Sequence, residues 1–149
     1  MRPSTIFEIA KHSKTIVMEL TKSQHLEKSH YETKQWISDI QFWSDELVFF
    51  KRILSEKIES NTDERSLTTL NQLMDQVKYY QEKLIVHFTK VLAEHESKLA
   101  HMISGQYTYY DSYGSEHANV SGHINSFRQE FRVFKKEFYI SLASDLPAS

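Results

Sequence analysis

The stretch "WISDIQFWSDELVFFKRIL" (residues 36–54) carries the clearest structural signal in the chain. Its apolar residues recur at alternating intervals of three and four, and the pattern continues for one more turn beyond it. The members of this series are Trp36, Ile40, Trp43, Leu47, Phe50, Leu54 and Ile58. Such spacing winds an apolar stripe along one side of an α-helix. The stretch therefore predicts a long helix with one face turned to a core.

Two later segments repeat this spacing. The second series is Leu67, Leu70, Met74, Val77, Leu84, Phe88 and Val91, with Gln81 and His95 at the same phase. The third is Ile124, Phe127, Phe131, Phe134 and Phe138, ending near Leu142. We interpret Gln81 as a polar residue that sets the register of the seam. With three glycines and two prolines among 149 residues, the chain has few turn formers, so long elements with few loops are expected. The predicted fold class is all-α, an elongated antiparallel helical bundle with coiled-coil-like seams.

The ends of these helices are predicted from cap residues. We expect a single domain over residues 1–149, with helices over about 5–20, 29–59, 62–103 and 121–144, and a tyrosine-rich loop over 105–120. Asn61 followed by Glu64 has the spacing of a capping box for the second long helix. Gly105 is placed to end that helix in the left-handed conformation. Ser121 or Ser115 would begin the third.

The N-terminal segment leaves two arrangements open. Residues 5–20 predict an amphipathic helix, and residues 21–29 could either bend or continue it. The first long helix has more apolar surface than two neighbours would cover, with Phe42, Phe49 and Ile53 beside its main stripe. Either the N-terminal helix folds back to complete a four-helix bundle, or two rods pair as a homodimer. Further candidates for an interface are the loop tyrosines, namely Tyr107, Tyr109 and Tyr110.

Composition argues against several functional classes. The net charge is −2 with Lys and Arg scattered among Asp and Glu, so no nucleic-acid partner is expected. No apolar run is long enough for a signal peptide or a membrane span, so we expect a cytoplasmic protein with no membrane partner. The chain lacks cysteine, which excludes disulfides and thiolate ligands. There is no nucleophile elbow and no glycine-rich phosphate loop, so neither an enzyme nor a bound cofactor is expected.

The histidines raise the question of a metal site. Antiparallel packing would bring His25 level with His95, and His101 level with His123, with His30 and His117 at the same end. Spacing excludes a classical di-metal site, because only Glu27 and His30 have a ligand-like separation on one helix. A mononuclear zinc or iron site remains as an alternative, with ligands drawn from His25, His30, His95, His101 and His123.

Two other interpretations compete with the metal site. In the simpler one these residues form the solvated end of a bundle, with His95 as a polar core residue satisfied by a neighbour or water. In the other, the clustered imidazoles make a surface whose association depends on pH, because protonated rings repel one another.

The order of three motifs supplies a resemblance. "WISDIQFWSDELVFFKRIL" is followed by "NTDE" at residues 61–64 and "AEHESKLAH" at residues 93–101. This order resembles a family of small bacterial helical proteins of unknown activity, over roughly residues 30 to 145. The resemblance implies a helical bundle and no particular reaction. The tyrosine-rich loop stands where that family would carry a more acidic, histidine-rich one.

The sequence therefore predicts a non-catalytic interaction or structural protein that acts through apolar helix faces, as a homodimer or with another protein. A metal-binding helical bundle is the competing prediction.

Overall fold

The described structure consists of helices and the short turns next to them. The computed structural model describes residues 3–105 and 110–144. Its elements are α1 (Pro3–Ser60), α2 (Glu64–Tyr79), the π-helix η1 (Tyr80–Ile85), α3 (Val86–Ile103) and α4 (Tyr110–Ser144). The all-α prediction is thus confirmed for these residues. None of the described helices is both long enough and apolar enough to cross a membrane.

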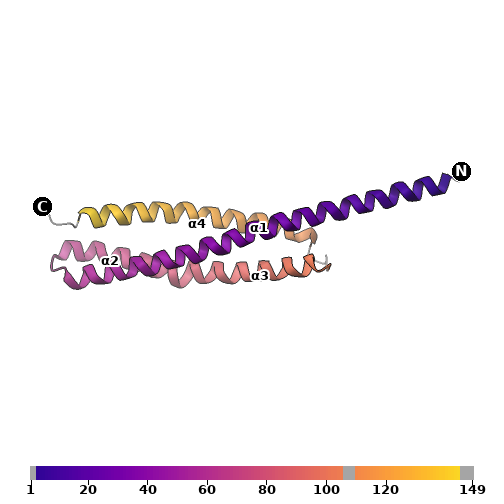
Figure 1. The fold of residues 1–149 in the computed structure, drawn as a ribbon. Helices are drawn as coiled ribbons and strands as arrows, with labels where there is room; N and C mark the ends of the chain where they lie inside the picture. Colours follow the sequence, from indigo (N-terminus) through magenta and orange to yellow (C-terminus); the bar gives the residue numbers. More distant parts are fainter. Residues whose placement is uncertain (1–2, 106–109, 145–149) are drawn as a thin grey trace.

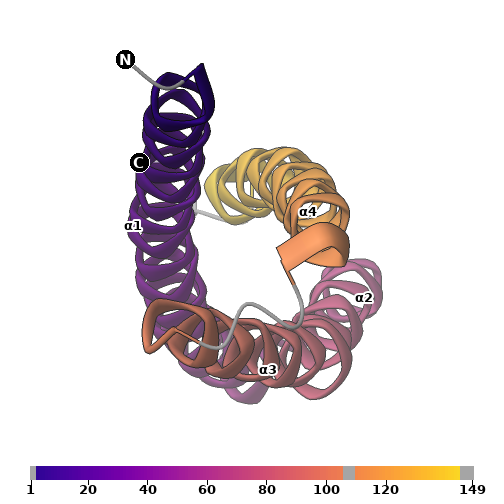
Figure 2. The same cartoon turned by 90° about the vertical axis from the view of Figure 1, so that its right-hand side faces the viewer.

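The helices form three rods that lie side by side (Figure 1). α2, η1 and α3 follow one another without a break and make a single rod that runs opposite to α1 and α4. Viewed along their length, the rods stand at the corners of a triangle around a shared interior (Figure 2). Buried side chains of all three rods meet in that interior.

The N-terminal segment does not form a helix of its own. α1 continues through residues 21–29 without interruption, and its first turns project beyond the ends of α3 and α4 (Figure 1). Of the two alternatives left open for residues 21–29, the continuous helix is the one observed, so the expected helix ends at residues 20 and 29 are wrong, and so is the four-helix arrangement with a folded-back N-terminal helix. The helix continues here because residues 21–29 contain neither proline nor glycine, the two residues that most disfavour a helix. Thr33 Oγ1 even donates a hydrogen bond to the carbonyl oxygen of Ser29, as in a helix interior.

The predicted seams of the first and third rods are confirmed. The buried members are Trp36, Ile40, Trp43, Leu47, Phe50 and Leu54 on α1, and Ile124, Phe127, Phe131, Phe134 and Phe138 on α4. Ile58 and Leu142 pack at the edge of this core. Phenylalanine rings join the two helices, for example Phe50 and Phe138 with ring centroids 4.4 Å apart. Aromatic pairs of this kind add to the apolar area that they bury.

The second rod departs from the prediction in part from η1 onward. Tyr80, Ile85 and Leu92 are buried in place of Gln81, Leu84 and Val91, which are half-buried, whereas the predicted members Phe88 and His95 are buried. A π-helical turn contains one residue more than an α-helical turn, so the phase of the seam moves by one position. Gln81 is consequently half-buried beside the core, and its interpretation as the register-setting seam residue is wrong.

The ends of the helices differ from the prediction in two places. Asp63, and not Asn61, caps α2, with its side chain accepting a hydrogen bond from the Ser66 amide. Asn61 Oδ1 accepts instead from the amide of Asp63, at 2.8 Å. Gly105 adopts a φ of 101°, which confirms the left-handed end predicted after α3.

α4 begins at Tyr110, so Ser115 and Ser121 lie inside a helix and most of the predicted loop is helical. The helix tolerates Gly114 and Gly122, each of which costs about 1 kcal/mol relative to alanine. The compensation comes from packing, because the first turns of α4 bury Tyr113 and Val120. Burial of a large side chain contributes roughly 1.5–3 kcal/mol, which exceeds the cost of one glycine.

Candidate functional site

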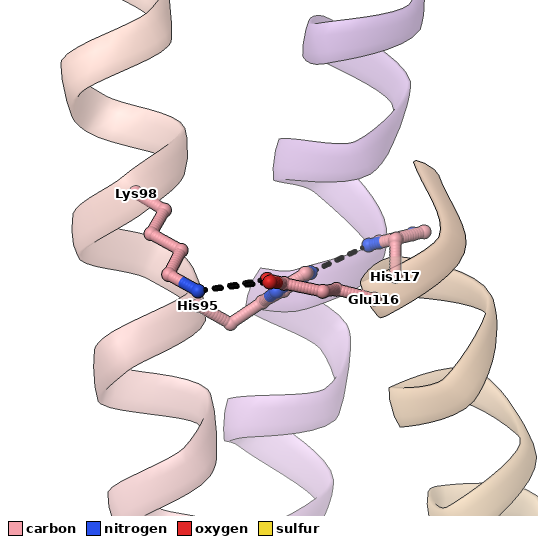
Figure 3. A network of polar contacts seen from close by, with 4 residues as sticks. All are labelled: His95, Lys98, Glu116 and His117. Atoms are coloured by element: carbon pink, nitrogen blue, oxygen red, sulfur yellow. Dashed lines mark hydrogen bonds and ion pairs between the residues drawn. The ribbon is translucent and has the colours of Figure 1, made fainter. Parts of the chain in front are cut away.

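A layer of polar and aromatic side chains interrupts the apolar interior near the C-terminal end of α3. We call it the histidine layer, and it consists of Glu32, Thr33 and Trp36 on α1, His95 on α3, and Tyr113 and His117 on α4. His95 is 3% exposed, and its Nε2 lies 2.8 Å from Nδ1 of His117 (Figure 3). The ring of Tyr113 stacks on that of His95, with centroids 4.5 Å apart and planes 8° from parallel.

The carboxylate at one end of the histidine layer indicates which ring nitrogens carry the protons. His117 Nε2 lies 3.5 Å from Glu32 Oε2, so the proton of this ring belongs on Nε2. His117 Nδ1 is then an acceptor, and His95 Nε2 donates to it. A chain of contacts therefore runs from α3 through α4 to α1, and it links all three rods at one level.

Burial keeps both imidazoles neutral. Desolvation lowers the pKa of His95 to about 4, and the charge of a protonated His117 acts in the same direction. The pKa of His117 is also lowered by burial, although the carboxylate of Glu32 partly opposes the shift. The pKa of Tyr113 is raised by burial to about 12. At neutral pH the three rings are uncharged, which suits their place inside the bundle.

Two polar contacts between rods flank the histidine layer at its solvent-facing edges. His30 Nδ1 lies 3.0 Å from Glu96 Oε1, between α1 and α3. Lys98 Nζ donates to both carboxylate oxygens of Glu116, at 3.0 and 2.9 Å, between α3 and α4 (Figure 3). Partly exposed pairs of this kind contribute little to stability. Their effect is to hold α3 in register with its two neighbours.

The predicted metal ligands are not brought together as a set. His30 and His95 lie at this level, but His101 is exposed and its Nδ1 lies 2.7 Å from the Ser97 carbonyl oxygen of its own helix. His25 and His123 are exposed at the rims of different grooves. Within residues 3–105 and 110–144, no group of three or more His, Asp or Glu side chains is arranged to hold a metal ion.

The predicted alignment of the first hairpin is also shifted. His30 on α1, and not His25, contacts the neighbour of His95 along α3. The turn is centred later than expected, since α1 runs to Ser60 and α2 starts at Glu64. The additional residue in η1 moves the alignment in the same direction. Zinc or iron at this end stays a prediction of the sequence.

A second candidate site is the exposed side of α1. Side chains on the first part of this helix are exposed at every position from 5 to 18. They include large apolar residues, namely Ile6, Phe7, Ile9, Ile16, Val17 and Met18, and Leu20 follows them. Further along the helix the exposed apolar residues are Tyr31, Ile37, Phe42, Val48 and Phe49.

The predicted interface residues fall partly on this side. Phe42 is 61% and Phe49 is 44% exposed, whereas Ile53 is half-buried against the core. Tyr107 and Tyr109 lie outside the described residues. Tyr110 is the first residue of α4, and its side chain also lies outside them.

Most of these exposed apolar residues share one side of α1. At about 100° per residue, they fall on the side opposite the buried stripe that starts at Leu26. We call this set the outer stripe, and it comprises Ile6, Ile9, Ile16, Val17, Leu20, Tyr31, Phe42 and Phe49. The sequence indicated the apolar residues of the N-terminal segment and those near Phe42 and Phe49 separately. That they lie on the same side follows only from the continuity of α1.

No family model, no curated protein and no solved structure matches the chain. The resemblance to small bacterial helical proteins therefore stays a prediction, and functional inference rests on the geometry described above.

Proposed function

We propose that the protein is a non-catalytic helical-bundle module that associates with itself through the outer stripe of α1. The observation that carries this proposal is the exposed apolar side of α1, which is dense from Ile6 to Leu20 and recurs at Tyr31, Phe42 and Phe49. Monomeric proteins rarely leave a large apolar patch in contact with water, and residues 6–20 carry such a patch. Association would remove that surface from solvent.

The projecting part of α1 supports the same conclusion. From residue 5 to residue 18 all of its side chains are exposed, so this part of the helix gains no stability from packing. Isolated helices of such length are marginal in water, because tertiary contacts supply most helical stability. Contact with another molecule would supply the packing that the other helices of the chain do not give to this part of α1.

In this proposal the histidine layer has a structural role. Its rings are neutral, stacked and held between the rods, and they fix the level at which α3 and α4 meet α1. A buried polar contact can impose one register on a bundle whose apolar seams would tolerate several.

The test is the mass of the assembly in solution, measured by size exclusion with light scattering. We expect the wild-type chain to be a dimer and Phe49→Asp to be a monomer, because a charge would be buried in the contact. Val133→Asp is the matched control, since Val133 is 57% exposed but lies on α4. A monomeric wild type, or equal effects of the two substitutions, would contradict the proposal.

Elemental analysis of the same fractions tests the competing prediction. Stoichiometric zinc or iron that disappears in His95→Ala and His101→Ala but persists in Phe49→Asp would favour the metal-binding bundle. Metal-free dimers would favour the interaction module.

A further inference from the structure

The histidine layer divides the interior of the bundle into two apolar parts. The larger part is the main core, which begins at Trp36 on α1 and ends at Leu92 on α3. The smaller part lies at the end of the bundle where α3 finishes, and we call it the end cluster. Its members are Leu26, Leu99, Met102 and Tyr113, each at most 3% exposed. Tyr113 belongs to both the layer and the end cluster, because its ring stacks on that of His95.

α4 contributes little to the end cluster. Among the described residues Tyr113 is its one member from this helix, whereas the others come from α1 and α3. Between Tyr113 and Val120 the side chains of α4 are exposed or half-buried. Beyond Ile124 the same helix gives a phenylalanine to the main core every three or four residues. The first turns of α4 are therefore attached chiefly through one aromatic ring and a few polar contacts.

Those polar contacts can be exchanged for contacts with water. Lys98 and Glu116, whose atoms lie 3.0 and 2.9 Å apart, have side chains that are 38% and 40% exposed (Figure 3). His117 lies 2.8 Å from His95 and 3.5 Å from Glu32. Hydrogen bonds and partly exposed ion pairs contribute little net stability, because water replaces the lost partner. These contacts position the first turns of α4 and add little to the free energy that holds them.

Two glycines weaken the helix at both ends of this stretch. Neither Gly114 nor Gly122 has a positive φ, and a Cβ built on either one would meet no neighbouring atom within 4 Å. Neither glycine is therefore required by a turn or by close packing. Each nevertheless lowers the equilibrium constant for helix formation by about fivefold relative to alanine.

From the divided interior, the single apolar anchor and the two glycines, we propose that residues 112–121 form a lid that opens by local unfolding, with Gly122 as its hinge. Opening uncovers the end cluster while the main core stays folded. Segments with few buried apolar contacts open locally at a lower free energy than the whole domain. Val120, at 9% the most exposed member of the main core on α4, is the last contact to separate, and the fully buried Ile124 stays in place. The open form presents an apolar site between α1 and α3 that the closed form hides.

Oxidation of Met102 by hydrogen peroxide reports the opening, because this side chain is 0% exposed and its sulfur reacts only when it is uncovered. Met18, which is 55% exposed, is the internal standard. Leu47→Ala removes a fully buried side chain from the main core, so it should raise hydrogen exchange of the amides between Phe127 and Phe138 at least tenfold. We expect the same variant to leave the oxidation rate of Met102 within about twofold. Equal acceleration of both processes would mean that only global unfolding reaches Met102, and it would overturn the lid.

Helix propensity inside the lid should set the same rate. Gly114→Ala should slow the oxidation of Met102 by about fivefold, and Ala118→Gly, at an exposed position, should accelerate it by a similar factor. Arg132→Gly is the matched control, since Arg132 is exposed on α4 beyond the hinge, and it should leave the rate within about twofold. Equal effects of Ala118→Gly and Arg132→Gly would overturn the lid. So would a rate that responds to neither substitution inside it, because another movement would then uncover Met102.

Discussion

The first and second parts of α1 belong to one unbroken helix, yet their surroundings have nothing in common. From residue 5 to 18 every side chain faces solvent, whereas from Leu26 onward a buried residue recurs every three or four positions. Apolar residues are frequent in both parts. The comparison shows that helix continuity here follows from the absence of breakers, while the apolar pattern records where neighbours are placed. Around the first part, the described residues place no such neighbours.

The largest expected effect is the difference in unfolding free energy lost when a large side chain is truncated in each of the two parts of α1. Phe50 is 1% exposed and touches several rings of α4, so Phe50→Ala should cost roughly 3–5 kcal/mol of unfolding free energy. Met18 is 55% exposed and lies off the outer stripe, so Met18→Ala should change it by less than about 0.5 kcal/mol. Urea denaturation of both variants at one protein concentration measures the difference. Similar losses would mean that the first part is packed in the folded chain.

A smaller expected effect is a dependence of the unfolding free energy on pH, which comes from His95 in the packed part of the molecule. The pKa of His95 is lowered from 6.5 to about 4 by burial, so the unfolded chain binds a proton more readily. Stability from this group is complete above pH 6.5 and is lost as the pH falls toward 4, by about 3 kcal/mol. Urea titrations across this range should show the loss.

Two variants define the source of that pH dependence. His95→Leu should reduce the slope between pH 6.5 and 4 and leave the smaller part that comes from the lowered pKa of His117, whatever its effect on stability at neutral pH. Leu70→Ala removes a fully buried side chain at the other end of the core, so it should lower stability by a similar amount at each pH. An unchanged slope in His95→Leu would show that another group is responsible.

The smallest effect is local and is seen by amide hydrogen exchange. Amides of residues 5–21 should exchange with little protection in dilute protein, and those between Trp36 and Leu54 should be protected by the global unfolding free energy. Protection of residues 5–21 should rise with protein concentration as the second copy packs against them. Low protection at all concentrations would count against a contact in this part.

The spacing of apolar residues was enough to predict α1 and α4, because each keeps one helical repeat along its buried seam. The seams on α1 and α4 agree with the structure residue by residue, because a buried stripe demands a fixed repeat. For residues 21–29 the sequence left a bend and a continuous helix open, because the stretch loses apolar content but contains no helix breaker, and the structure shows the continuous helix. Polar residues such as Lys22 and Gln24 are compatible with a helix, and only their contacts decide whether it is packed.

The histidine layer was predicted only in part. His95 was recognised as a polar residue at a buried phase, but its partner His117 lay in the segment interpreted as a loop. A signal for it was present, since Val120, His117 and Tyr113 continue the α4 spacing backward from Ile124 by three turns. Contacts across rods, such as that between His117 and Glu32, depend on rotation and level, which one chain's periodicity does not define.

The π-helix η1 also indicates how the sequence of the second rod could have arisen. If one residue were removed between Tyr80 and Ile85, the buried residues from Tyr80 to His95 would follow the ordinary spacing of four, three, four and three. The same core would then sit on an uninterrupted α-helix. η1 thus has the form of a single-residue insertion that the fold absorbed as one wide turn, without moving a side chain out of the interior.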